Sequence, residues 1–455
     1  MVRTPALLVP SRALACLARR GWLALFALVS GASSSAGQSL FDEVWRTAGH
    51  ERSAAGEESA ALDVREGFLD GTETGTGFGE DYLLGVPRDL RPGDTRPLLL
   101  AWHGFGSPPR QIFRDTDYPE ECARRGWFLL APRGLDDKSF GFPPAQRNVR
   151  AVLARVLLEQ PVDRQRLYAV GWSMGAQSAL CFAARHREDA VARFAAVAAL
   201  QGPHDLLDTY ARESAPLRLW MERLFGAAPF VDERPYRRSS VLRLDGARLG
   251  HASEPSYAAH LVDLPLLLVH APDDPLSYLR AQNLALGTWL RERGAPVHEW
   301  SVRGRTPAHD WRITSASSVC AWLARYEVAD PPRVCELVSD GEASRLGVRL
   351  APRGDASFAT ARIARSEGQW ELGVLRGTRE VLLDAAGLGV PLEAPLTLKL
   401  FGGGASVEQV RLFGLAAPPR AAYRGGRALR DAPWSAEEGL LLLAPGASSR
   451  WRIER

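Results

Sequence analysis

Short runs of consecutive hydrophobic residues alternate with helix-like segments along residues 82–325. Uninterrupted runs of this kind are typical of strands that are buried on both faces of a parallel sheet. The alternation therefore predicts an α/β domain with a doubly wound, mostly parallel sheet over residues 81–330. The expected strands are 82–86, 97–102, 126–132, 167–170, 194–198, 264–269 and 298–302, and the clearest helices are 149–159, 176–186, 279–293 and 312–325.

The pattern changes after residue 326. Paired prolines in the segment Ala329-Asp330-Pro331-Pro332 mark a boundary, because they end a helix and stiffen a linker. The runs that follow are short, strand-like and separated by Gly, Pro and Asp. They predict a smaller all-β, sandwich-like domain over residues 333–455. Residues 38–80 are mixed and mostly polar, and we expect them to form an N-terminal arm.

The first 37 residues have the order of an export signal. Residues 1–20 are basic and free of acids, residues 21–32 are apolar, and residues 33–37 are small. Twelve apolar residues are too few to cross a membrane, which requires about twenty. The pair Arg19-Arg20 hints at the twin-arginine route. We expect removal of a signal peptide (residues 1–37) and a secreted or periplasmic protein without a membrane span.

Composition narrows the class of protein. The chain has 455 residues, 46% hydrophobic and 24% charged, which excludes wholesale disorder and fibrous structure. Its net charge of +3 (56 basic and 53 acidic residues) includes four arginines of the leader. The basic residues are scattered, which argues against nucleic acid as a partner. Only Lys138 and Lys399 are lysines.

Four cysteines follow the leader: Cys122, Cys181, Cys320 and Cys335. No pair has the CxxC spacing of a zinc ribbon or a thioredoxin-like motif. Spacing leaves open whether Cys320 and Cys335 form a disulfide, whereas Cys181 lies in an apolar helical segment typical of a buried thiol. No histidine or carboxylate cluster has metal-ligand spacing, so we expect neither a metal nor a cofactor.

The most informative segment is Gly171-Trp172-Ser173-Met174-Gly175, which joins an expected strand to an expected helix. Glycines at these positions permit a tight turn that places the serine above the edge of the sheet. The N-terminus of the helix adds partial positive charge where an anion would form. A helix-capping serine is the alternative interpretation. We interpret Ser173 as a candidate nucleophile.

A serine nucleophile requires a base, and the base requires an orienting acid. In a sheet of this topology the acid and then the histidine follow the serine along the chain. Asp273 and Asp274 directly follow the strand that ends at His270, and one of them is more simply explained as a turn residue. His309 ends a Gly/Pro-containing loop after the next strand and is the candidate base.

The segment after strand 97–102, His103-Gly104-Phe105-Gly106, offers backbone N–H groups for an oxyanion. One donor is expected from Met174, which follows the serine, and the other from Phe105 or, less favoured, from Gly104 or Gly106. We interpret His103 as a residue that braces this loop, because the candidate base is His309.

Together these motifs resemble the α/β-hydrolase family. The resemblance covers residues 80–328 and is closest to secreted esterases, polyhydroxyalkanoate depolymerases, feruloyl or acetylxylan esterases and the catalytic domains of prolyl-oligopeptidase-type peptidases. It implies a catalytic triad of Ser173, Asp274 and His309, because the family's acid lies four residues after the residue that ends the strand. Ala176 and Ala271 depart from the family's usual glycines. The matching segments are residues 97–106, 161–175, 270–277 and 307–311.

The resemblance implies acyl transfer through Ser173, and the leading hypothesis is a secreted carboxylic-ester hydrolase. A serine peptidase is the first alternative, disfavoured because roughly 45 residues before the domain cannot form a β-propeller with blades of ~40 residues. An inactive hydrolase fold that binds a polysaccharide or a cell surface is the second. The expected substrate is a small-molecule or polymer-linked ester, with possible surface contact through the C-terminal domain.

Residues 213–260 are expected to form an insertion over the site. Trp172, Trp220 and Phe230 are candidate substrate-binding residues. Packing of the insertion against the sheet explains its aromatic residues equally well and is the simpler interpretation, since aromatic residues dominate cores.

Overall fold

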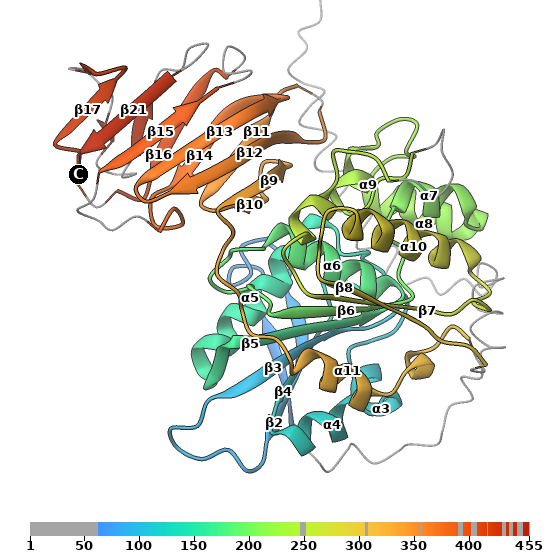
Figure 1. The fold of residues 1–455 in the computed structure, drawn as a ribbon. Coiled ribbons are helices and arrows are strands. Elements are labelled where there is room, and N and C mark those ends of the chain that lie inside the picture. The colour runs from blue at the N-terminus through green and yellow to red at the C-terminus, as the bar shows by residue number, and fades with distance from the viewer. Residues whose placement is uncertain are drawn as a thin grey trace, which may run out of the picture. The chain divides into compact units, whose positions relative to one another are not determined.

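The computed structural model describes residues 62–245, 252–304, 308–354, 356–389, 395–401, 407–415, 417–429, 434–435, 440–443 and 449–454. The expected signal peptide and the first part of the expected arm lie outside these residues. Residues 52–455 form one compact unit, in which an α/β part precedes a β-sandwich part (Figure 1). Among the described helices, none is both long and apolar enough to cross a membrane.

The α/β part contains an eight-stranded sheet in the order β1-β2-β4-β3-β5-β6-β7-β8. The pairs β1–β2 and β2–β4 are antiparallel, whereas all later neighbours are parallel. The fully buried runs predicted from the sequence lie in the middle of this sheet, because helices cover both of its faces. The strands are β1 (Leu62–Leu69), β2 (Glu80–Pro87), β3 (Arg96–Trp102), β4 (Phe128–Pro132), β5 (Val162–Trp172), β6 (Ala196–Leu200), β7 (Leu266–His270) and β8 (Val297–Ser301).

The helices lie on both sides of the sheet, with α3, α4 and α11 on one side and α6 and α10 on the other (Figure 1). This arrangement confirms the predicted doubly wound α/β class. Between β6 and β7 the chain forms α7, α8, α9 and the 3₁₀ helix η1. The helices are α3 (Arg110–Asp115), α4 (Tyr118–Arg125), α5 (Pro143–Glu159), α6 (Met174–Arg185), α7 (Leu206–Arg212), α8 (Ala215–Phe225), α9 (Arg234–Arg238), η1 (Tyr257–Leu261), α10 (Ser277–Arg291), η2 (Trp311–Ile313) and α11 (Ala316–Leu323).

The expected arm over residues 38–80 differs from the structure in its described portion. Strand β1 pairs along its whole length with β2 and forms the edge of the sheet. Its ends, Leu62 and Leu69, are buried, while the middle of the strand is polar and exposed. The polar middle hid the strand in the sequence, because an antiparallel edge strand needs only a few inward-facing apolar residues.

The sequence predicts an all-β, sandwich-like domain here, and the structure has one. It consists of a six-stranded and a seven-stranded sheet. One core of buried residues joins the two sheets and includes Leu350, Val381, Ile363, Leu398 and Trp451. The strands are β9 (Val334–Ser339), β10 (Ser344–Arg345), β11 (Val348–Pro352), β12 (Ala359–Ser366), β13 (Gln369–Arg376), β14 (Thr378–Asp384), β15 (Leu396–Leu400), β16 (Gln409–Phe413), β17 (Ala421–Arg424), β18 (Arg427–Ala428), β19 (Trp434–Ser435), β20 (Leu440–Leu443) and β21 (Ser449–Glu454).

Cys122, Cys181, Cys320 and Cys335 are all free thiols in the structure. Cys320 is fully buried in α11 and Cys335 lies on β9, so the disulfide left open by their spacing is not formed. Cys181 is buried inside α6, and this burial raises the pKa of its thiol to about 11.

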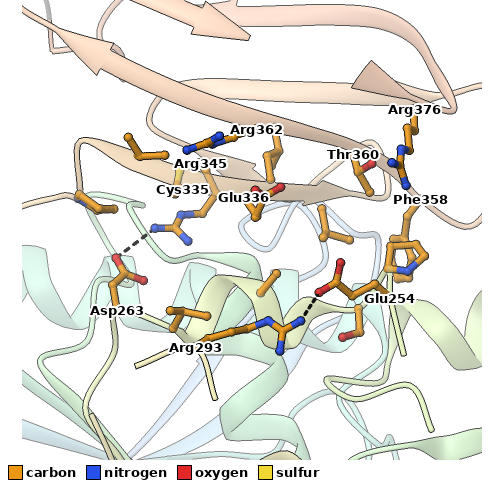
Figure 2. A pocket seen from close by; sticks show the side chains of 18 of the residues that line it. Glu254, Asp263, Arg293, Cys335, Glu336, Arg345, Phe358, Thr360, Arg362 and Arg376 are labelled. Atoms are coloured by element: carbon orange, nitrogen blue, oxygen red, sulfur yellow. Dashed lines mark hydrogen bonds and ion pairs between the residues drawn. The ribbon is translucent and has the colours of Figure 1, made fainter. Parts of the chain in front are cut away.

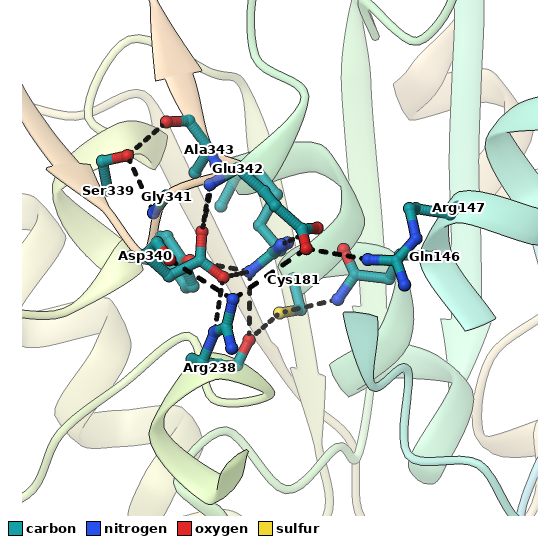
Figure 3. A network of polar contacts seen from close by, with 12 residues as sticks. Gln146, Arg147, Cys181, Arg238, Ser339, Asp340, Gly341, Glu342 and Ala343 are labelled. Carbon is teal, nitrogen blue, oxygen red and sulfur yellow. Dashed lines mark hydrogen bonds and ion pairs between the residues drawn. The ribbon is translucent and has the colours of Figure 1, made fainter. Parts of the chain in front are cut away.

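Buried ion pairs join the two parts of the chain. Arg185, the last residue of α6, donates to the carboxylate of Asp340, which follows β9. Arg238 donates to the same oxygen over 2.8 Å (Figure 3). Tyr257 Oη accepts from Arg185 over 2.7 Å. The two arginines hold the pKa of Asp340 well below its usual range, although burial acts in the opposite direction. A buried charge with several partners fixes the junction in one geometry.

A second cluster lies beside the first. Arg345 of β10 is buried and donates to Glu188 over 2.8 Å and to Asp263 over 3.0 Å. His260 of η1 is also buried, with Nδ1 2.8 Å from the carbonyl oxygen of Ala184 and Nε2 accepting the Val338 N–H over 2.8 Å. His260 therefore serves the junction as a neutral imidazole, protonated only on Nδ1.

Replacement of Asp340 by alanine should destabilise the protein strongly. The change leaves the fully buried Arg185 with only the partly exposed Glu342 as a carboxylate partner, and breaking a buried pair from one side costs about 3–5 kcal/mol. We expect a loss of this size in the free energy of unfolding measured with urea. Glu342→Ala is the matched control, because Glu342 contacts the same arginine but is half exposed; its loss should stay below about 1 kcal/mol. Equal losses in both variants would contradict this assignment.

Acid should weaken the junction through His260. Burial lowers the pKa of His260 to about 3, whereas an unfolded histidine titrates near 6.5. Between these values the unfolded chain binds more protons, so the free energy of unfolding falls as the pH drops below about 6.5. His260→Asn should reduce the slope of this free energy between pH 4 and 6 by about one proton, measured by denaturant titrations at each pH. An unchanged slope would show that His260 does not contribute.

Candidate active site

A strained turn places Ser173 between β5 and α6. Its backbone has φ 54° and ψ −124°, a conformation that non-glycine residues rarely adopt. A Cβ on Gly171 would lie 2.1 Å from the carbonyl oxygen of Gly175, and one on Gly175 would lie 2.2 Å from that of Trp102. The two glycines of the motif are therefore required by close approach of backbone segments, and the serine between them is held in a single orientation.

Three side chains from different loops meet at this turn. His309 Nε2 lies 3.1 Å from Ser173 Oγ, and His309 Nδ1 lies 2.9 Å from Asp274 Oδ2. All three residues are at most 6% exposed. The structure thus brings together the serine, the acid and the histidine that the sequence analysis selected. Asp273 is exposed, and Asp274 is the member of the pair that contacts the histidine.

Asp274 is held by further donors. Its Oδ2 also accepts from Gln201 Nε2 over 2.8 Å, and its Oδ1 accepts the N–H of Leu276 over 2.8 Å. These hydrogen bonds orient the carboxylate toward His309. The carboxylate can therefore hold His309 in the tautomer that carries its proton on Nδ1.

Gln201 is a site residue that the sequence analysis missed. It directly follows β6, has φ 52°, and its Nε2 donates to the carbonyl oxygen of Ala308 as well as to Asp274. One amide therefore ties the acid to the backbone just before His309. The sequence signal that could have identified Gln201 was its position directly after a buried strand, because the ends of parallel strands meet at the same edge of the sheet.

Aromatic rings pack behind the histidine. Trp172 lies against His309 with ring centroids 5.0 Å apart and against Trp311 at 6.0 Å, and Trp311 in turn meets Tyr118 at 5.7 Å. Trp172 is only 1% exposed, and a Cβ on Gly104 would lie 2.4 Å from its ring. The sequence analysis names Trp172 as a candidate substrate-binding residue. In the structure its ring instead packs against His309 and against the loop that contains Gly104.

The loop after β3 lies beside the serine. His103 is buried, and its two ring nitrogens lie 2.9 Å from the carbonyl oxygens of Gly104 and Arg133, so it braces the loop as the sequence analysis interprets it. Gly106 has φ 73° and donates its N–H to Asp137. Met174 is the first residue of α6, where helix N–H groups have no acceptor within the helix.

A second strained loop, residues 133–142, supports the loop after β3. Leu135 and Phe140 both have positive φ. Glu80 is buried beneath them and accepts the N–H groups of Gly134 and Leu135 over 2.5 and 2.7 Å. Burial raises the pKa of Glu80 to about 7, against the opposing effect of these hydrogen bonds. This buried carboxyl could not be recognised in the sequence, because its partners are the backbone of loop 133–142 and the side chain of Asn148, both distant along the chain.

The remaining candidate residues come from the insertion. Trp220 of α8 donates its Nε1–H to the carbonyl oxygen of Lys138 over 3.1 Å, which fixes the helix to loop 133–142. Phe230 follows α8 and is 86% exposed. Its role in substrate binding stays a prediction. Within the described ranges, no three His, Cys, Asp or Glu side chains are grouped so that they could hold a metal ion.

A cavity of about 720 Å³ lies away from these residues, between η1 and strands β9, β12 and β13 (Figure 2). Its lining includes Glu254, Arg293, Glu336, Arg362 and Arg376, which carry charges of both signs. Arg293 is paired with Glu254 over 2.8 Å across one side of it. None of Ser173, Asp274 and His309 lines this cavity.

Comparison with known protein families agrees with the strand order of the sheet and with the turn at Ser173. Residues 100–278 match the family model described as alpha/beta hydrolase fold. Together with the strand order, this match shows that the α/β part has the α/β-hydrolase fold, as the resemblance implies. A search of curated protein sequences gave no match.

Several solved structures are similar to part of this chain at low sequence identity. A ferulic acid esterase is 16% identical, with a TM-score of 0.43, covering 58% of this chain and 98% of its own. A fluorophosphonate-binding serine hydrolase of Staphylococcus aureus is 13% identical, with a TM-score of 0.40 and the same coverages. An acylaminoacyl peptidase of Pyrococcus horikoshii is 18% identical, with a TM-score of 0.42, covering 60% of this chain and 42% of its own.

Replacement of Gly175 by alanine should disrupt the turn. The new Cβ would lie 2.2 and 2.5 Å from two backbone oxygens, which cannot move without shifting β3. We expect a loss of about 1–3 kcal/mol or more in the free energy of unfolding. Gly202→Ala is a useful comparison, because the atom nearest to its added Cβ is the methyl group of Ala176 and not backbone. A smaller loss for Gly175→Ala than for Gly202→Ala would contradict the close backbone approach.

Proposed function

We propose that the protein is a serine hydrolase that cleaves carboxylic esters through an acyl-enzyme on Ser173. The observation that carries the proposal is the hydrogen-bonded series of Ser173, His309 and Asp274, buried at the ends of β5, β7 and β8. The strained backbone at Ser173 supports it, because such strain persists where a function depends on it. The order of the three residues along the chain is the one typical of this fold.

In the proposed mechanism each side chain has one task. Asp274 accepts a hydrogen bond from the Nδ1–H of His309, which leaves the lone pair of Nε2 directed at Ser173 Oγ. As Oγ attacks the ester carbonyl, Nε2 takes its proton and Asp274 stabilises the resulting imidazolium. His309 then gives the proton to the leaving alcohol, and the acyl group remains on Ser173. Water, activated by the same histidine, attacks this ester and releases the acid.

The negative oxygen of each tetrahedral intermediate requires donors. The N–H of Met174 is the first of α6, where the helix dipole also favours negative charge. The second donor is the N–H of Phe105, with Gly104 as the alternative, in the loop that His103 braces. Each such donor contributes about 3 kcal/mol to the stability of the transition state.

We further propose that the mature protein is secreted or periplasmic, on the strength of the leader pattern in residues 1–37. The substrate is then a small-molecule or polymer-linked ester outside the cytoplasm. Contact of the β-sandwich part with a polysaccharide or another surface stays a prediction. A pull-down on insoluble polysaccharide with Ser173→Ala tests binding separately from turnover.

Ser173→Ala should abolish ester hydrolysis. Loss of the nucleophile in such a triad lowers kcat by roughly 10⁴- to 10⁶-fold. The measurement is turnover of 4-nitrophenyl esters from acetate to decanoate, together with labelling by a fluorophosphonate, which should modify Ser173 in the wild type only. Labelling without ester turnover would move the proposal to peptide bonds, tested with peptidyl 4-nitroanilides. No labelling of a folded wild type would contradict the serine mechanism.

The two neighbouring aspartates offer a matched pair of variants. Asp274→Asn should lower kcat by about 10⁴-fold, because an amide no longer favours the required tautomer of His309. Asp273→Asn should leave kcat within about twofold, since its side chain is exposed and makes no contact with the histidine. Equal losses for both variants would show that the acid has been assigned incorrectly.

A further inference from the structure

Lys138 lies beside the loop proposed to supply an oxyanion donor. Its Nζ is 5.5 Å from the centroid of the Phe105 ring and 5.5 Å from that of Trp220. Its Cε would be 3.4 Å from a Cβ built on Gly106. The ammonium group therefore lies over a ring of this loop and a ring of α8, and the alkyl chain of Lys138 lies beside Gly106, the residue that follows Phe105.

Backbone hydrogen bonds and aromatic rings hold Lys138 in place, and neither cancels the positive charge of its ammonium group. The carbonyl oxygen of Lys138 accepts a hydrogen bond from Trp220 Nε1, and the backbone N–H of Lys138 donates to Asp136 Oδ1 over 2.7 Å. Phe105 packs against Phe140, which lies in loop 133–142 together with Lys138; the ring centroids are 5.3 Å apart. Aromatic faces attract a cation but leave its charge available to a ligand.

The charge of Lys138 is not used within the described part of the chain. No carboxylate there lies within 4.0 Å of its Nζ, whereas neighbouring acids have other partners: Asp137 pairs with Arg133 over 2.9 Å. Asp136 accepts the backbone N–H of Lys138 itself. Lys399, the other lysine of the chain, is by contrast paired with Glu371 over 2.5 Å. A partly buried ammonium group without an acidic partner is suited to bind an anion that comes with the substrate.

We propose that Lys138, held by Phe105 and Trp220, is a subsite for a carboxylate on the ester substrate. The inference rests on the proposed function and names its substrate class: esters that carry a negative charge near the scissile bond. Phe105 would thereby serve twice, through its N–H to the oxyanion and through its ring to the lysine. The competing interpretation is that Lys138 only fastens α8 to the loop through its backbone and its alkyl chain.

The test compares charged esters with matched neutral ones. 4-Nitrophenyl hydrogen succinate and its methyl ester place the charge on the acyl side, and 4-acetoxybenzoate and its methyl ester place it on the alcohol side. The readout is the ratio of kcat/KM for the charged ester over the neutral ester. Lys138→Met should lower this ratio about 10- to 100-fold for at least one pair, as expected for loss of a charge-assisted contact. Lys138→Arg should retain most of it, and Lys399→Met should leave it unchanged.

A second measurement does not depend on turnover. Succinyl 4-nitroanilide should bind Ser173→Ala at least about tenfold more tightly than it binds the Ser173→Ala, Lys138→Met double variant, in calorimetric titrations at low salt. Equal ester ratios in wild type and Lys138→Met, together with equal affinities in this titration, would overturn the subsite. Lysine-dependent binding by a wild type that cleaves no ester would instead refute the proposed function and keep the anion subsite.

Discussion

Helix α6 is buried along its whole length, and the rest of the structure is arranged around that constraint. All twelve of its residues are shielded from solvent, between the sheet, the insertion and the β-sandwich part. It spans about 18 Å at 1.5 Å per residue. Its N-terminus follows the strained turn at Ser173, and its C-terminus is Arg185, which pairs with Asp340. A shift of this helix would therefore disturb the serine and the junction together.

The same constraint explains which parts of the fold could be predicted from the sequence. The buried strands are largely apolar runs and α6 is mostly apolar, so their pattern can be recognised without knowledge of their neighbours. Strand β1 could not be recognised, because its pairing with β2 supplies what its polar middle lacks. The junction was equally hidden, since Arg185 and Asp340 are 155 positions apart and each alone is typical of a surface residue.

The candidate site likewise contains residues that a sequence motif reveals and residues that only the folded chain brings together. Ser173 was recognisable because close backbone approaches require glycine at positions 171 and 175, and this requirement leaves a short motif in the sequence. His309 followed from chain order, and a family resemblance already favoured Asp274 over Asp273; in the structure Asp274 is the one that contacts His309. Gln201, Glu80 and the position of Lys138 depend on loops that meet only in the folded chain. No local pattern marks such residues, because their partners are distant along the chain.

The pairing of Arg185 with Asp340 also links folding to protein synthesis. At roughly 5–20 residues per second, a ribosome needs about 8–30 s to add the residues that separate them. During that time β6, β7 and β8 are added in turn, while α6 ends in a cation whose buried partner Asp340 has not yet been made. The nascent α/β part can therefore reach its final packing only after β9 has emerged, so the C-terminal part acts as a late folding partner for the sheet made before it.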